Sequence, residues 1–222
     1  MDQKNKNFKE QFYLILTGIF IASLVASNLI FQKFFTWNFL SIDFELSVGI
    51  IAYPVTFLVT DLISELYGQK RANQVVVSGF FASIFTTLLV LISVNAVAVQ
   101  WSPIDNITFT KVFGLTGPAF FASMVAYLTA QLIDVRIFHF WKRLTKGKHL
   151  WLRNNASTMF SQLVDTSVIL IILCLAGVIE WERFYSLWMM GWLFKVLVAL
   201  IDTPIIYGII YLLKGKIDIA KE

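Results

Sequence analysis

Long apolar runs, separated by short polar segments, recur along the whole chain. Six of these runs are long enough to cross a bilayer, because a helix needs about 20 residues to span roughly 30 Å of hydrocarbon. Helices are the expected form of such runs, since a helix satisfies its own backbone hydrogen bonds without water. The pattern predicts an all-α integral membrane protein in which residues 1–222 form a single domain. The predicted transmembrane helices cover residues 12–34, 46–67, 73–99, 118–141, 155–178 and 187–213.

The composition agrees with this pattern. Of the 222 residues, 58% are hydrophobic and only 14% are charged, whereas about 25% of the residues in an average soluble domain are charged. Pro54 and Pro204 fall inside two of the predicted helices, where each should free a backbone carbonyl and bend its helix. The connection 100–117 is the longest on its side of the membrane, and we expect either a plain loop or a partly re-entrant one.

Basic residues gather on one side of the predicted helices. Thirteen Lys and Arg residues lie on the side that holds both chain ends, and three lie on the other side. Connections rich in Lys and Arg stay in the cytoplasm, so both ends are predicted to be cytoplasmic. The net charge of +4 therefore indicates contact with anionic lipid headgroups and no nucleic-acid partner. The thirteen are Lys4, Lys6, Lys9, Lys70, Arg71, Lys142, Arg143, Lys146, Lys148, Arg153, Lys214, Lys216 and Lys221, and the three are Lys33, Lys111 and Arg183.

Ionisable side chains also occur inside the predicted helices. Such residues are costly in a bilayer and mark binding sites or ion pathways. Asp61 and Glu65 are four residues apart, on one helix face, and Lys195 and Asp202 share a face at a spacing of seven. Glu65 lies near a helix end, where its side chain could instead reach the interface. Lys195 is predicted to pair with Asp165 or Asp61, which would offset the cost of its burial.

The fourth and fifth predicted helices carry matching polar motifs. QLIDV at 131–135 resembles QLVDT at 162–166, and LIDT at 200–203 repeats part of the pattern. We expect each motif to aim a carboxylate inward, because lipid does not tolerate polar stripes. The candidate substrate-binding residues are Asn28, Asp61, Gln131, Asp134, Thr158, Gln162, Asp165 and Lys195, followed by Glu65 and Asp202.

Small residues form a stripe on the first predicted helix. Gly18, Ala22 and Ala26 recur at intervals of four, which permits close approach of another helix. The stripe could serve packing within the fold, a homodimer or docking to a partner subunit. Packing within the fold is the favoured interpretation.

Motifs of enzymes are missing from the sequence. It contains no His-Glu-x-x-His, no Gly-x-Ser-x-Gly and no phosphate-binding glycine loop. The two histidines, His139 and His149, flank the basic segment and are expected to be solvated instead of binding a metal. We therefore predict no catalytic residues, no metal and no cofactor. A carrier, or a substrate-binding membrane subunit, is the remaining class.

The sequence resembles the queuosine precursor transporter family, also called the vitamin uptake transporter family. The resemblance extends over most of the chain, and the order and spacing of its motifs carry it. They are YPVTFLVTDL at 53–62, ELYG at 65–68, Ala126-Tyr127 with Gln131 and Asp134, Ala156-Ser157-Thr158 with Asp165-Thr166, Phe194-Lys195-Val196 and Ser27-Asn28.

The resemblance implies a fold, a substrate class and a location. The fold would be like that of the six-helix substrate-binding subunits of energy-coupling-factor importers. The substrates would be 7-cyano- or 7-aminomethyl-7-deazaguanine, or queuine, imported across a bacterial inner membrane. Two interpretations stay open: a self-sufficient carrier, driven for example by protons through Asp61, Asp134 or Asp165, and a binding subunit that needs an ATP-driven partner.

Overall fold

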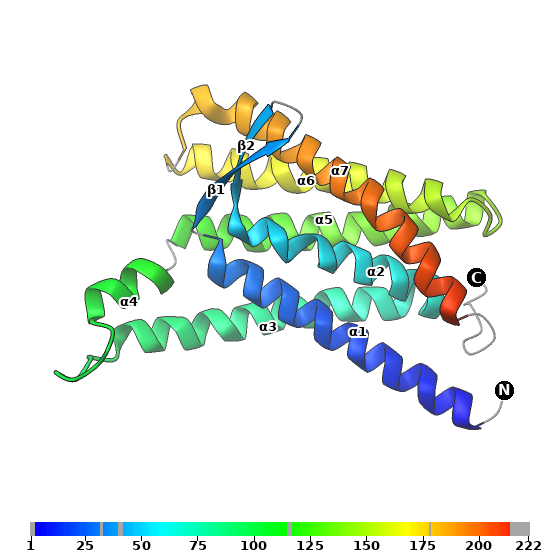
Figure 1. Cartoon of the computed structure of the whole chain (residues 1–222), viewed down its shortest axis with the longest axis horizontal. Helices are drawn as coiled ribbons and strands as arrows, with labels where there is room; N and C mark the ends of the chain where they lie inside the picture. Colours follow the sequence, from blue (N-terminus) through cyan, green and yellow to red (C-terminus); the bar gives the residue numbers. More distant parts are fainter. Residues whose placement is uncertain (1–2, 32, 40–41, 115–116, 178, 214–222) are drawn as a thin grey trace.

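The computed structural model describes residues 3–31, 33–39, 42–114, 117–177 and 179–213. In this part of the chain, long helices run side by side along the molecule, and α1 and α7 cross the others obliquely (Figure 1). α1 begins and α7 ends at the same end of the bundle (Figure 1). The helices are α1 (Gln3–Ile30), α2 (Tyr53–Tyr67), α3 (Gln69–Asn95), α4 (Asn106–Phe113), α5 (Gly117–Leu144), α6 (Leu150–Leu175) and α7 (Trp181–Leu213).

Each predicted transmembrane segment contains a long helix. Among the residues that the structure describes, five helical segments are both long and apolar enough to span a membrane: Asn5–Ile30, Val48–Tyr67, Gln69–Asn95, Leu150–Leu175 and Trp181–Leu213. α5 has 28 residues and is also long enough to cross a bilayer. The protein is therefore an integral membrane protein. The predicted boundary at Val178 and the basic tail with Lys214, Lys216 and Lys221 lie outside the described residues.

The fold is helical as predicted, with one addition that the sequence analysis did not predict, a short β-hairpin. β1 (Phe34–Phe39) pairs antiparallel with β2 (Ile42–Ser47), with Phe34 opposite Ser47. The first helix therefore ends at Ile30, short of the predicted residue 34. β1 is rich in aromatic residues and β2 alternates apolar with polar residues, two strand signals that a search for apolar runs does not detect.

The second predicted helix is divided in two. Residues Val48–Ile51 form a 3-10 helix, η1, and α2 begins separately at Tyr53. Pro54 lies in the first turn of α2, where its missing N–H leaves no hydrogen bond broken. The predicted bend at Pro54 is therefore wrong, whereas Pro204 does lie inside α7.

The connection 100–117 contains the short helix α4, none of whose residues is buried. The Asp105 carboxylate caps this helix by accepting a hydrogen bond from the Thr108 backbone N–H at 2.7 Å. This hydrogen bond lowers the pKa of Asp105 below its ordinary value. Figure 1 shows α4 beyond the end of α3, apart from the bundle.

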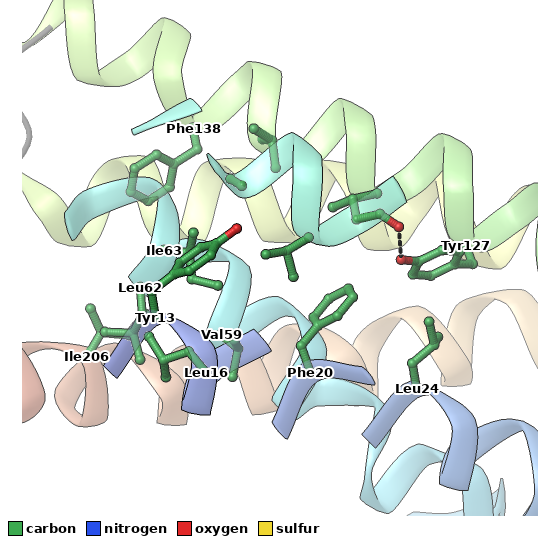
Figure 2. Close-up of a cluster of buried hydrophobic side chains, with 14 of the residues drawn as sticks. Tyr13, Leu16, Phe20, Leu24, Val59, Leu62, Ile63, Tyr127, Phe138 and Ile206 are labelled. Atoms are coloured by element: carbon green, nitrogen blue, oxygen red, sulfur yellow. Dashed lines mark hydrogen bonds between the residues drawn. The ribbon is translucent and has the colours of Figure 1, made fainter. Parts of the chain in front are cut away.

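The hydrophobic core lies between α1, α2, α3 and α5. Phe20 and Leu24 of α1 are fully buried in it, and Val59 and Ile63 of α2 face them across the cluster (Figure 2). The Tyr127 hydroxyl donates a 2.7 Å hydrogen bond to the Val76 carbonyl, which ties α5 to α3 (Figure 2). This side of the bundle is apolar. The buried polar side chains lie instead where α5, α6 and α7 pack against α2.

The small-residue stripe of α1 points away from this core. Gly18, Ala22 and Ala26 are exposed, and a Cβ atom on Gly18 would meet nothing within 4 Å. The expectation that the stripe packs within the fold is therefore wrong. The inward face of α1 is instead the one that carries Phe20 and Leu24.

Candidate functional site

Polar side chains of α2, α5, α6 and α7 meet inside the bundle at three levels along its length. The first level lies near the start of α2. There the Lys195 ammonium is 2.6 Å from the Asp165 carboxylate, which confirms the predicted pairing with one of its two candidates. The Tyr53 hydroxyl donates to the other oxygen of Asp165 at 2.9 Å, and Lys195 also donates to Thr166 at 3.1 Å. α2, α6 and α7 are thereby joined.

The second level is a pair of buried carboxyl groups, Asp61 on α2 and Asp134 on α5. Asp61 and Asp134 lie close enough to interact electrostatically, and their side chains are 2% and 0% exposed. The Thr158 hydroxyl donates to Asp61 at 3.3 Å, and the Ser161 hydroxyl donates to Asp134 at 2.8 Å. Two carboxyl groups are thus supported by hydroxyl groups of α6.

An amide lies beside this pair. The Gln131 side chain, fully buried on α5, donates to the Thr56 hydroxyl at 3.1 Å and accepts from the Thr60 hydroxyl at 3.2 Å. Both partners belong to α2. Because its oxygen and its nitrogen each have a partner, Gln131 holds α2 and α5 together.

The third level is an ion cluster of Glu65, Lys142 and Arg153, here called the Glu65 cluster. The Glu65 carboxylate is 2.6 Å from Arg153 and 3.5 Å from Lys142, and all three residues are buried. Arg153 also donates to the carbonyls of Gly147 and Lys148. Two cations that were assigned to a solvated connection are therefore inside the protein, and Glu65 does not reach the interface.

A narrow crevice opens beside the first level. Its cavity volume is about 10 Å³, close to the space that one water molecule needs, and it is lined by ten residues of η1, α2, α6 and α7. Tyr53 and Phe57 line one wall, and Gln162, Lys195 and Asp202 contribute polar groups. Ligand pockets commonly measure about 300–1,000 Å³, so a purine-sized molecule needs the surrounding side chains or helices to move apart.

Two polar groups of the crevice are available for a ligand. The Gln162 side chain is 3% exposed, and its carbonyl oxygen accepts no hydrogen bond from the described residues. Asp202 is half-buried. It lies near enough to Asp61 for the two carboxyl groups to interact electrostatically. An amide and a carboxylate beside two aromatic rings suit a flat ligand with several hydrogen-bond donors.

The β-hairpin lies over this end of the bundle (Figure 1). The Trp37 ring meets the Phe194 ring edge to face, with centroids 5.4 Å apart. Phe194 directly precedes Lys195 in α7. The hairpin therefore rests on the helix that carries the cation of the first level.

Most of the predicted site residues come together. Thr158 joins the second level to the crevice, since it contacts Asp61 and also lines the crevice. The carboxyl groups predicted to point inward do so: Asp134 and Asp165 are buried, and Asp202 faces the crevice. Glu65 lies with its two cations at the third level instead of at the crevice.

Asn28 lies apart from these levels, between α1, α3 and α5. Its side-chain oxygen accepts a 3.0 Å hydrogen bond from Ser123. It lines a separate small hollow of about 10 Å³ together with Ser83, Thr86 and Thr87. The structure thus does not bring Asn28 to the crevice.

Sequence reasoning did not assign several residues of this polar interior. Tyr53 entered only as part of a family motif, although a tyrosine at a helix start beside a proline could have been considered. Lys142 and Arg153 were read as loop cations because they lie near helix ends. His139 was expected to be solvated but is 0% exposed, whereas His149 is exposed as predicted.

A family model described as "Putative vitamin uptake transporter" matches residues 47–209. The queuosine precursor transporter of Escherichia coli is 23% identical over 211 residues, which cover 93% of this chain and 89% of that protein. A probable queuosine precursor transporter of Bacillus subtilis is 28% identical over 163 residues, 73% of this chain and 70% of that protein.

A second probable queuosine precursor transporter, from Haemophilus influenzae, is 27% identical over 172 residues. The match covers 76% of this chain and 69% of that protein. No solved structure matches the chain.

Proposed function

Because the chain belongs to the vitamin uptake transporter family, we propose that it imports queuosine precursors across the inner membrane of a bacterium. The names of the three relatives support this class of substrate. The substrates proposed are 7-cyano-7-deazaguanine, 7-aminomethyl-7-deazaguanine or queuine. All three share a flat 7-deazaguanine ring, which the crevice must recognise.

The carrier spans the membrane six times, with both ends in the cytoplasm. The five apolar helical segments and the 28-residue α5 supply the six spans. An even number of spans agrees with the start of α1 and the end of α7 at one end of the bundle (Figure 1). The excess of Lys and Arg at that end supports the cytoplasmic side.

The crevice is the observation that carries the proposal. The ring N–H and the neighbouring amino group of a deazaguanine are adjacent donors, which one carboxylate accepts together. Asp202 offers that carboxylate, and the Gln162 amide reads a second edge of the ring. Tyr53 and Phe57 stack on the ring face, which is worth about 1–3 kcal/mol per base in comparable sites.

The Asp165–Lys195 pair adds a preference among substituents. The pair lies beside the crevice, with the Tyr53 hydroxyl on the same carboxylate. The substituent of 7-aminomethyl-7-deazaguanine is cationic at neutral pH, so Asp165 can accept it alongside Lys195. The neutral 7-cyano group gains no such ionic contact.

The first experiment is calorimetric binding to the purified protein. We expect binding of the 7-deazaguanines and queuine, weaker binding of guanine and no binding of unrelated vitamins. Asp202→Asn and Gln162→Leu should each weaken binding at least tenfold, since each loses contacts to the ring. Glu180→Gln, whose side chain is 78% exposed, is the matched control and should bind like the wild type. Absence of binding by every deazaguanine would refute the proposed substrate class.

A second function is favoured by the exposed stripe of α1. Gly18, Ala22 and Ala26 face away from the bundle and leave room for another helix, as in a substrate-binding subunit docked on an ATP-driven partner. Purified protein in liposomes separates the two functions. Uptake without ATP or a partner supports the carrier, whereas binding without any uptake supports the subunit.

A homodimer would appear as a doubled mass in detergent that Ala22→Leu reduces.

A further inference from the structure

The Asp61–Asp134 pair has an unusual charge balance. Both carboxyl groups are buried, and each accepts a hydrogen bond from a hydroxyl group of the same stretch of α6, Asp61 from Thr158 and Asp134 from Ser161. Asp61 Oδ1 and Asp134 Oδ2 are buried and have no donor among the described residues. Two neighbouring ionised carboxylates repel each other, whereas one proton between them turns the repulsion into a hydrogen bond. The geometry therefore calls for a proton.

Charged groups on the neighbouring elements are engaged elsewhere. On α6 and α7, Asp165 and Lys195 pair with each other at 2.6 Å. The cations Lys142 of α5 and Arg153 of α6 lie on Glu65 of α2, one helical turn beyond Asp61.

Further groups complete the surroundings of the pair. Asp202 of α7 acts on Asp61 with a like charge, which strengthens the need for a proton. His139 of α5 lies five residues after Asp134. The charged residues of the described parts of α1 and α3 lie near their amino-terminal ends. No ion pair therefore neutralises Asp61 or Asp134 among the described residues.

The pair is connected to the crevice by one hydroxyl group. Thr158 donates to Asp61 at 3.3 Å and also lines the crevice, as does Asp202. A hydroxyl group both donates and accepts, so it can pass a proton between a carboxylate and water in the crevice. Beyond the pair, the Glu65 cluster separates it from the opposite end of the bundle. A proton thus reaches the pair from the crevice while the other end is closed.

We infer that the Asp61–Asp134 pair binds one transported proton and couples its movement to import through the crevice, so that the protein is a proton symporter. The inference rests on the proposed function. A proton from the external water binds to a carboxylate oxygen of the pair when the substrate occupies the crevice. The proton leaves to the cytoplasm after the helices rearrange, and one proton enters for each substrate molecule. No covalent bond other than the O–H bond changes.

The test measures protons and substrate together. Wild-type protein is reconstituted into liposomes that contain a pH-sensitive dye, with the membrane potential clamped by potassium and valinomycin. Addition of 7-cyano-7-deazaguanine should acidify the interior. An external pH one unit lower than the internal pH should drive about tenfold accumulation, because a unit of pH is worth about 1.4 kcal/mol per proton. A protonophore should abolish this accumulation.

Two variants test whether Asp61 and Asp134 couple proton movement to substrate uptake. Asp134→Asn and Asp61→Asn should each remove the substrate-dependent acidification and the response of uptake to pH, since an amide cannot exchange the proton. Glu10→Gln changes a carboxylate that is 57% exposed and paired to Arg71 on the surface, and it should acidify the interior like the wild type.

The outcomes distinguish a failure of the proton inference from a failure of the proposed import function. Wild-type uptake without acidification overturns the proton inference and leaves the import function intact. Absence of both uptake and acidification overturns the self-sufficient carrier and the proton inference with it, and substrate binding then tests the partner-dependent subunit. Acidification that persists in both Asn variants also overturns the assignment to this pair. The wild-type measurement decides even if a variant fails to fold.

Discussion

Glu65 illustrates how burial changes the meaning of a single charged residue. On the sequence it is one of several carboxylates near a helix end, but in the structure it receives two buried cations from α5 and α6. The Arg153 guanidinium also lies 5.6 Å from the Phe138 ring centre, so the cluster is embedded in the apolar core. Loss of the carboxylate leaves two cations buried without a counter-ion, which is the costly case for ion pairs.

We therefore expect Glu65→Gln to lower the free energy of unfolding by about 3–5 kcal/mol. Glu10→Gln is the matched control, because it breaks an ion pair of 3.2 Å whose partners are both exposed, and such pairs contribute about 1 kcal/mol or less. The measurement is the unfolding transition of both variants in detergent. Equal transitions would show that the Glu65 cluster does not stabilise the fold.

At the residue scale, the structure also separates three roles that the sequence combined. Asp61, Asp134, Asp165 and Asp202 are all carboxylates inside helices, but their partners differ. Asp165 has a lysine, Asp61 and Asp134 have each other, and Asp202 faces the crevice. Only the partner of each carboxylate distinguishes an ion pair, a proton site and a ligand contact.

At the scale of the elements, two glycines on neighbouring helices have opposite surroundings. Gly79 of α3 lies where α1 and α5 come close, and a Cβ atom there would be 2.6 Å from Phe20 and 2.7 Å from the Tyr127 hydroxyl. That hydroxyl is buried and bonded to Val76, so it cannot yield without losing its partner. Gly18 of α1 has open space around it.

We expect Gly79→Ala to destabilise the protein by about 1–3 kcal/mol, the usual cost of overpacking a core. Gly18→Ala makes the same chemical change at an open position and should leave the unfolding midpoint unchanged or slightly raised, since alanine favours a helix. Thermal unfolding in one detergent compares the two variants. A similar loss in both would mean that helix geometry, not packing, explains the effect.

The hairpin and α7 form the second notable combination of elements. β1 and β2 lie across the outer part of the bundle (Figure 1), and Trp37 contacts Phe194 beside the ion pair. A ligand that enters from this end must pass the hairpin or displace α7. The element that the sequence prediction missed is therefore one that packs on α7 next to Lys195.

At the scale of the whole molecule, the position of α5 decides the topology. α5 is not one of the five candidate spans found among the described residues, yet the charge bias predicts opposite sides for its two ends. The connection with α4 precedes it, and the basic segment 142–153 follows it. A direct test of α5 therefore tests the count of six spans as well.

We expect a single cysteine at Lys111 to react with a membrane-impermeant maleimide in intact cells, and one at Lys148 to react only after permeabilisation. Both positions are exposed, and Cys174 is first replaced by serine because it is the one cysteine of the chain. Reaction of both positions in intact cells would show that α5 does not cross the membrane. The reversed result would invert the orientation.

The sequence by itself determined the class of the protein and the residues worth examining. Apolar runs reveal membrane helices because lipid leaves the backbone no other partner, and buried charges stand out because lipid penalises them. The predicted helices, the inward carboxylates and the pairing of Lys195 with a carboxylate, either Asp165 or Asp61, follow from these two constraints. Family motifs then indicated the substrate class.

Tertiary structure alone decided how those residues are divided among three levels. Whether Lys142 is solvated or buried, and whether Asp134 meets a cation or Asp61, depends on contacts between helices that are distant in the sequence. The hairpin was not predicted, because strands are stabilised by pairing with one another, and a search for apolar runs does not detect such pairing. The sequence also did not show which way the small-residue face of α1 points. The spacing of Gly18, Ala22 and Ala26 defines a face, but only the packing of the helices shows that this face points outward.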